Sequence, residues 1–273
     1  MKSNKKKEAK KTRRFFSVFG IPYAVFLILF IIIPILIIVY YAFTENGQFS
    51  ISAAASFFTS WAKWKVLLIS MFVALQTTII CLLIGYPLAY FLANKKFNKN
   101  TVLVTLFIAP MWINFVLRTG ATRDLLTWIG VKGGRMPYFA TLVGMVYNYL
   151  PFVILPLYST MLKLDKSLME AASDLGANPF QVFIKALAPQ TIPGIVSATL
   201  MTFMPTMSSY VISDVLSENM ITLFGNYINT EFGLGSWNTA SFMAMIMLLI
   251  VGISLFINLK FNKDKESGRT QLW

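Results

Sequence analysis

Acidic and aromatic residues in the C-terminal part of the chain are the side chains best suited to chemistry. Between Lys185 and Lys260 the chain has no basic residue, although its net charge is +13, and this stretch holds Asp214, Glu218 and Glu231. A carboxylate beside aromatic faces binds an organic cation through ion pairing and cation–π attraction. The aromatic neighbours are Tyr210, Phe224, Tyr227, Phe232 and Trp237. The pattern predicts a cation-binding surface, and the alternative is that all three acids simply face water.

The composition excludes most catalytic and metal chemistry. The 273 residues include no His and a single Cys, Cys81. These counts argue against histidine catalysis, a disulfide within the chain, and zinc, haem or iron–sulfur sites. Cys81 lies in an apolar stretch, where we interpret it as a small buried hydrophobic residue. A G-x-x-x-x-G-K-[ST] phosphate loop is impossible because Gly-Lys never occurs. We therefore expect no catalytic site and no cofactor in this chain.

Residues 164–189 follow a second pattern, which predicts two short helices joined by a tight corner. Ser167 and Glu170 form an S-x-x-E capping box that predicts a helix from Leu168. Gly176 is placed to end that helix in the left-handed conformation. Asn178 then caps a second helix, with Pro179 at its first position.

We expect the second helix to run until Pro189 interrupts it. On the first helix, the small side chains of Ala171 and Ala172 allow another backbone to approach closely. The pair of helices therefore suits insertion into a groove of a partner, although a simple hairpin has the same local signals.

The elements that position these residues are hydrophobic helices. The chain is 56% hydrophobic and 13% charged, against roughly 25% charged in a soluble domain. A bilayer core needs about 20 apolar residues per helix. We predict an all-α membrane domain over residues 21–262, between a basic tail at 1–20 and a second tail at 263–273. Its six predicted spans are 21–43, 66–93, 101–119, 137–162, 190–213 and 236–260. The first run is too long, and lacks the small-residue site, for a cleaved signal peptide.

Loop charges predict the orientation. With the N-terminus inside, 18 Lys and Arg residues fall in cytoplasmic segments and six fall outside. The positive-inside rule therefore places both termini in the cytoplasm. Eight of the 24 Lys and Arg residues fall in the first 14 positions and not over a folded face, so we expect no nucleic-acid partner. The outer segment 118–135 departs from the rule, with four basic residues and only Asp124 as an acid. We interpret it as a structured or functional loop.

The segment after the fourth predicted span resembles the EAA loop of bacterial ABC-importer permeases, E-A-A-x-x-x-G and then, after nine residues, I/V-x-L-P. This chain has Glu170-Ala171-Ala172, Gly176 and Pro189, with Ala188 where the family usually has Leu. The resemblance implies the type I importer (MetI-like) fold in a bacterial cytoplasmic membrane. It also implies a set of residues that couple the spans to an ATPase: Glu170, Ala171, Ala172, Asp174, Gly176, Asn178, Pro179 and Pro189.

Two further stretches are similar to the PotB-type permeases of spermidine/putrescine importers. One is Pro110-Met111-Trp112 followed by Arg118-Thr119, and the other is Tyr210-Val211-Ile212-Ser213-Asp214. Thr122 departs from this pattern, since many relatives have Trp there. The resemblance implies polyamine transport by alternating access. Our candidates for the substrate path are Trp112, Tyr147, Tyr210, Asp214 and Glu218; Trp112 is also typical of an interfacial aromatic belt.

The same resemblance implies partners. They are a second, PotC-like permease, two PotA-like subunits that bind ATP and Mg, an extracytoplasmic PotD-like polyamine-binding protein, and membrane lipid. The alternative within the class is an importer of another solute, an inorganic anion or a sugar, which the basic segment 118–135 favours. A secondary transporter would need charges inside the spans, and the uncharged runs contain none. A membrane enzyme would need a catalytic constellation, which the composition does not supply.

Overall fold

A computed structural model describes residues 21–94, 98 and 102–270, with side chains as far as Phe256. The predicted basic tail at 1–20 and the last three residues, 271–273, lie outside the described residues. The described chain divides into two compact units, one of residues 21–59 and 231–246 and the other of residues 60–230 and 247–270. Helix α13 (Trp237–Thr270) belongs to both, and it continues beyond the predicted end of the last span at 260.

The first unit begins with the apolar helix Ile21–Ala42, which contains the π-helical turn η1 (Ile28–Ile32) and α2 (Ile33–Ala42). A hairpin of β1 (Thr44–Glu45) and β2 (Gln48–Phe49) follows, and then α3 (Ser52–Thr59). Phe43, Phe57 and Phe58 pack their rings against Phe242 of α13 at centroid distances of 6.0 to 6.3 Å. This aromatic cluster is the core that joins the two chain segments of the unit.

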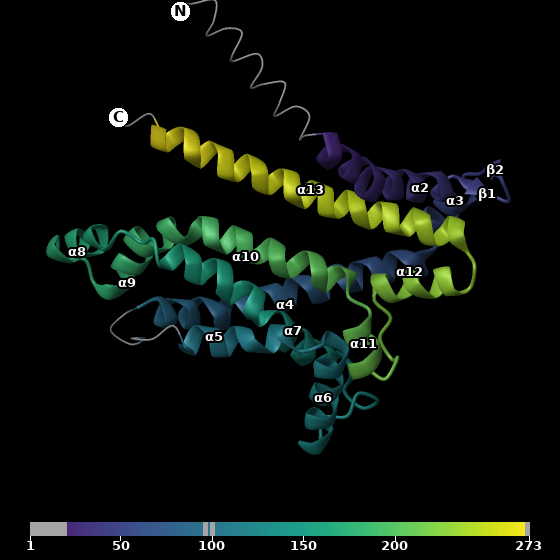
Figure 1. Cartoon of the computed structure of the whole chain (residues 1–273). Helices are drawn as coiled ribbons and strands as arrows, with labels where there is room; N and C mark the ends of the chain where they lie inside the picture. Colours follow the sequence, from purple (N-terminus) through teal and green to yellow (C-terminus); the bar gives the residue numbers. More distant parts are fainter. Residues whose placement is uncertain (1–20, 95–97, 99–101, 271–273) are drawn as a thin grey trace, which may run out of the picture. The chain divides into compact units, whose positions relative to one another are not determined.

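The second unit is built on three long helices that pack against one another, α4 (Trp61–Ala93), α7 (Pro137–Met161) and α10 (Ala188–Ser208). Figure 1 shows α8 and α9 beyond one end of these helices, and α6 and α11 at the other end. The remaining elements are α5 (Val102–Ile108), the 3-10 turn η2 (Ala109–Trp112), α6 (Phe115–Trp128), α8 (Lys166–Asp174), α9 (Pro179–Val182), the π-helical turn η3 (Phe183–Leu187), α11 (Val211–Leu216) and α12 (Phe224–Gly233).

The distribution of side chains on α4 is typical of a helix in lipid. Its exposed face carries Leu68, Phe72 and Leu75, whereas Thr77 and Cys81 are fully buried. Small and weakly polar side chains on the buried face let helices approach closely, and apolar side chains on the outer face suit the hydrocarbon. The interpretation of Cys81 as a small buried residue is confirmed.

The number of long apolar helices differs from the predicted six. In the described residues, four helices are long and apolar enough to cross a membrane, or five if one bent pair counts as a span. That pair is the predicted third span, which is not one straight helix. Val102–Trp112 and Phe115–Trp128 meet at 99°. The chain is extended at Ile113, and the side chain of Asn114 starts a new helix by accepting hydrogen bonds from the N–H groups of Val116 and Leu117.

The predicted fifth span, 190–213, is also interrupted. Helix α10 ends at Ser208, and α11 begins as a separate helix at Val211. Helix α10 is not among the strongly apolar helices because its sequence mixes Pro, Thr and Ser with the apolar residues. Polar threonines such as Thr202 and Thr206 are buried, so they lower its mean hydropathy without facing lipid.

Candidate functional site

The first helix of the predicted elbow, α8, begins two residues earlier than expected. Asp165 is its N-cap, and its Oδ1 accepts the Ser167 N–H at 2.9 Å and the Ser167 hydroxyl at 2.7 Å. The predicted capping box of Ser167 and Glu170 is therefore wrong. Asp165 takes the capping position because its carboxylate accepts both bonds, which leaves Ser167 inside the first turn. These two hydrogen bonds lower the pKa of Asp165 below its ordinary value.

The corner after α8 has the geometry predicted for Gly176. Its φ is +81°, in the left-handed region. The Gly176 N–H donates to the Ser173 carbonyl at 2.9 Å, and the Ala177 N–H donates to the Ala172 carbonyl at 3.1 Å. This pair of bonds is a Schellman motif, which satisfies carbonyls at the end of a helix and turns the chain sharply.

The second helix of the elbow starts as predicted. Asn178 Oδ1 accepts the Gln181 N–H at 2.9 Å, and Gln181 Oε1 accepts the Asn178 N–H at 3.0 Å. Pro179 occupies the first helical position, where its missing N–H removes no bond. The prediction of an Asn178 cap is confirmed, and Gln181 is a partner that sequence reasoning missed. An N-cap followed three residues later by Gln is the signal that identifies it.

Pro189 does not interrupt the helix as predicted. The chain passes from α9 through the π-helical turn Phe183–Leu187 directly into α10. In this turn the Ala188 N–H bonds to the Phe183 carbonyl, five residues back. A wider turn at this point accommodates the proline, which lacks an N–H and would crowd the preceding turn of an α-helix. The same arrangement precedes Pro34, where η1 leads into α2.

Gln190 holds the elbow to α10. Its Oε1 accepts the Asp165 N–H at 3.0 Å, and its Nε2 donates to the Ala186 carbonyl at 2.9 Å. The start of α8 and the start of the long helix are therefore joined by one side chain. A displacement of α8 would be transmitted to α10 at this point.

The elbow presents a mixed apolar and acidic surface. No residue of α8 or α9 is buried, and Leu175 at the corner is 89% exposed. Leu168 and Phe180 are also exposed, as are Glu170 and Asp174. Large apolar side chains gathered on an exposed surface indicate a site for a protein partner. The predicted coupling residues Ala171, Gly176, Asn178, Pro179 and Pro189 are exposed as well, and Ala172 is half-buried.

A buried arginine braces the break between η2 and α6. Arg118 is 7% exposed. Its Nη1 donates to the Pro110 carbonyl at 2.7 Å, and its Nε donates to Asn148 Oδ1 at 2.7 Å. The guanidinium thus joins η2 to α7. It also lies 5.9 Å from the ring of Tyr147, so this candidate for the substrate path faces a cation of the same chain.

Two of the five substrate-path candidates, Tyr210 and Asp214, belong to one cluster. Asn226 of α12 donates from Nδ2 both to the Asp214 carboxylate and, at 3.1 Å, to the Tyr210 carbonyl. Tyr210 and Asp214 therefore lie together, and Asn226 is a member that sequence reasoning missed. Burial raises the pKa of Asp214, while the bond from Asn226 lowers it. Glu218 is exposed with φ +52°, and Trp112 is 78% exposed at the end of η2.

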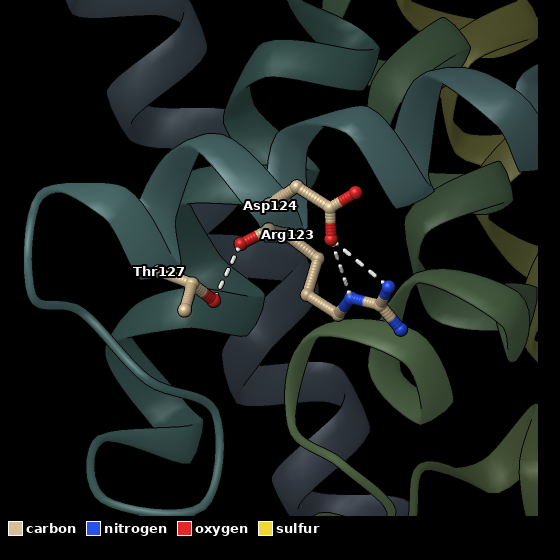
Figure 2. Close-up of polar contacts among 3 residues, drawn as sticks. All are labelled: Arg123, Asp124 and Thr127. Carbon is tan, nitrogen blue, oxygen red and sulfur yellow. Dashed lines mark hydrogen bonds and ion pairs between the residues drawn. The ribbon is translucent and has the colours of Figure 1, made fainter.

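The basic segment 118–135 is mostly a helix and not a loop, since α6 covers Phe115–Trp128. Figure 2 shows that Arg123 forms an ion pair with Asp124, at 2.9 Å. The carbonyl of Arg123 also accepts the Thr127 hydroxyl at 2.9 Å. Two of the four basic side chains, Arg118 and Arg123, are therefore engaged within the chain.

The sequence matches the model of a protein family over residues 83–263, which include the whole elbow. The family is described as the binding-protein-dependent transport system inner membrane component. This chain belongs to that family. It is thus a permease subunit of a binding-protein-dependent ABC importer and a multi-pass membrane protein.

Curated members of the family are similar to this permease over most of its length. The spermidine/putrescine transport system permease protein PotB of Salmonella typhimurium (strain LT2) is 32% identical over 269 residues, which cover 91% of this chain and 94% of that protein. PotB of Escherichia coli (strain K12) is 32% identical over 252 residues, covering 85% and 92%.

Solved importers share the fold at much lower identity. A bacterial ABC transporter that imports the acidic polysaccharide alginate matches with a TM-score of 0.63 and 15% identity, over 92% of this permease and 98% of that chain. The MetNI methionine ABC transporter, in inward-facing conformations, matches with a TM-score of 0.53 and 16% identity, over 76% and 99%. The type I importer permease fold is therefore confirmed.

Proposed function

We propose that this permease moves a polyamine, spermidine or putrescine, across the bacterial cytoplasmic membrane by alternating access. The observation that carries the proposal is the similarity to permeases named for spermidine/putrescine transport, along nearly the whole chain. The cluster around Asp214 supports it, because a half-buried carboxylate that accepts only a neutral amide donor from Asn226 can still pair with an ammonium group.

In this proposal the elbow receives work from an ATPase subunit. Leu168, Leu175 and Phe180 enter a groove of that partner, and the acids Glu170 and Asp174 lie beside them. Closure of two ATP-binding subunits displaces α8, and the hydrogen bonds of Gln190 to Asp165 and Ala186 transmit the displacement to α10. The ATP and Mg bind to the partner subunits, and this chain contributes a lever and part of the path without covalent chemistry.

The opposite end of the helices receives the substrate. Figure 1 shows α11, which carries Asp214, far from the elbow along α10. An extracytoplasmic binding protein releases the polyamine there, into a path completed by a second, similar permease. Trp112, Tyr147 and Glu218 remain candidates for the walls of that path. The elbow and both termini face the cytoplasm, an orientation supported by the 18 to 6 distribution of basic residues.

The competing proposal of an anionic solute depends on the basic residues of 118–135. Arg118 is buried in hydrogen bonds, and Arg123 is paired with Asp124. Neither guanidinium is free to attract an anion without first losing these partners. The case for an anionic solute is thereby reduced to the two exposed side chains of Lys132 and Arg135, and the uptake assay tests phosphate and a sugar directly.

The test is uptake of labelled spermidine by vesicles containing the complete importer, with putrescine, phosphate and a neutral sugar as competitors. We expect competition by putrescine alone. Asp214→Asn should raise KM at least about tenfold, equivalent to about 1.4 kcal/mol, whereas the matched change Asp124→Asn should leave KM unchanged. Because burial raises the pKa of Asp214, KM in the original protein should fall as pH rises through that pKa. Unchanged uptake in Asp214→Asn would remove Asp214 from the path, and competition by phosphate or sugar would refute the polyamine proposal.

A further inference from the structure

A cavity of about 590 Å³ lies in the first unit, between the hairpin and the start of α13. Its position depends on the two-residue turn Asn46-Gly47, where both residues have positive φ, +51° and +79°. Such a turn matches the twist of two antiparallel strands and fixes their register, here with Glu45 opposite Gln48. Asn-Gly is the sequence signal for such a turn. The turn thereby places Glu45 on the wall of the cavity.

The carboxylate of Glu45 is held in place by neutral donors. Its Oε2 accepts the Ser52 hydroxyl at 2.6 Å and the Ser50 hydroxyl at 3.1 Å. Neutral hydroxyl groups orient a carboxylate without neutralising its charge. Within the described part of the chain, the cavity lining contains no Lys or Arg. The site therefore carries an oriented negative charge that faces the cavity.

Aromatic rings form the other side of the cavity. Tyr40, Tyr41 and Trp237 line it. The Tyr41 ring lies 5.6 Å from that of Tyr40 and 6.0 Å from that of Trp237. Asn238 fixes this wall, since its Nδ2 donates to the carbonyls of Tyr41 and Ala42 at 3.2 and 3.1 Å. The C-terminal end of α2 is thereby attached to the beginning of α13.

The Glu45 carboxylate and the three aromatic rings together favour one class of ligand. A Ca²⁺ ion takes six to eight oxygen ligands, and Mg²⁺ takes six, with carboxylates supplying the charge. Among the described residues that line the cavity, Glu45 is the one carboxylate and the other polar side chains are neutral hydroxyls and amides, so little charge is available for a divalent ion. An alkylammonium group gains from both parts, because the carboxylate pairs with its charge and the ring faces attract the cation and cover its methylenes. The volume is within the range of small-molecule sites, roughly 300–1,000 Å³.

We propose that this cavity of the first unit binds an ammonium group of a linear polyamine through residues other than those of the cluster around Asp214. The identity of the ligand rests on the proposed function, whereas the cation selectivity of the cavity rests on Glu45 and the three rings. Under the predicted orientation the hairpin follows the first span on the outer side, so the site would hold a polyamine before it enters the membrane path.

The experiment is a calorimetric titration of spermidine into the purified importer complex in lipid nanodiscs without its binding protein. Glu45→Gln keeps an oxygen that accepts both serine hydroxyls and removes only the charge. We expect it to weaken one class of spermidine site at least tenfold. Trp237→Leu keeps the carboxylate and should weaken the same site, with a smaller effect. The matched control Asp124→Asn, another exposed acid changed to its amide, should bind as the original protein does.

Equal spermidine affinity in Glu45→Gln and the original protein would overturn the inference, as would a Glu45-dependent site that binds Mg²⁺ as tightly as spermidine. Cation binding lost in Glu45→Gln but unaffected in Trp237→Leu would overturn the role of the rings. A failure of the proposed function is detected by a different measurement, because the original importer would then take up no spermidine. The titration does not depend on uptake, since it compares spermidine binding by the Glu45→Gln variant with binding by the original protein.

Discussion

Replacement of Gly176 at the corner of the elbow tests whether the geometry of the elbow, and not only its composition, carries the coupling. The residue has φ +81°, a conformation in which an ordinary L-residue is less stable by roughly 1–2 kcal/mol. A Cβ added at Gly176 would meet nothing within 4 Å. The penalty is therefore purely conformational, and it corresponds to a factor of roughly 5 to 30 in the population of the native corner.

We expect Gly176→Val to reduce the amount of substrate transported per ATP hydrolysed about fivefold or more. Gly176→Asn should lose less, because Asn enters the left-handed region more readily than a β-branched residue does. The thermal stability of the protein should hardly change, since no residue of α8 or α9 is buried. The assay measures ATP hydrolysis and labelled uptake on the same reconstituted vesicles, so that a loss of coupling is separated from a loss of protein.

Gly120→Ala is the matched control. An added Cβ at Gly120 also meets nothing within 4 Å, but the residue lies within α6, where Ala is preferred to Gly by about 1 kcal/mol. Its coupling should equal that of the original protein. If Gly176→Val transports as much substrate per ATP as the original protein, the corner is not part of the lever. If Asn and Val are equally impaired, the left-handed conformation is not the cause.

Three further changes test other contacts. Arg118→Gln removes the donors to the Pro110 carbonyl and to Asn148 and should lower the free energy of unfolding by about 1–3 kcal/mol, measured by thermal or denaturant unfolding in detergent. Asn178→Ala removes an N-cap and should weaken α9 by about 1 kcal/mol, measured as faster amide exchange over 180–182. Because the pKa of Asp165 is lowered in the folded state, its cap should protect the Ser167 amide fully above the ordinary carboxyl pKa of about 4. This protection should be lost as pH falls through the folded-state value.

Each of these changes has its own control. Arg123→Gln, on the same helix as Arg118, breaks only an exposed ion pair and should cost less than about 1 kcal/mol; an equal loss in both variants would contradict the bracing role of Arg118. Asn178→Ser retains a capping oxygen and should keep most of the protection. Asp165→Asn should abolish the pH dependence of the Ser167 amide, and an unchanged profile would assign the titration to another group.

Much of the elbow was predictable because its signals are local. The Asn178 cap, Pro179 at the first helical position and the left-handed Gly176 depend on residues within one or two turns, and all three have the predicted geometry. The error at Ser167 arose within the same range, because Asp165 and Ser167, two residues apart, are both capping residue types. Asp165 accepts two hydrogen bonds from Ser167. The capping-box pattern considers only Ser167 and Glu170, so it does not include Asp165 as an N-cap.

The sequence by itself determined the class of protein. The long uncharged runs and the elbow pattern predict a helical membrane subunit, because hydrophobicity and capping act through composition and short-range contacts. Only the tertiary structure decided where two predicted spans break, that Arg118 is a buried brace and that Asn226 joins Tyr210 to Asp214. It also decided that Glu45 and Trp237, far apart in the sequence, line the same cavity. These outcomes depend on partners distant in sequence. The free energy that stabilises these arrangements comes from burial and from hydrogen bonds that form only after the helices have packed.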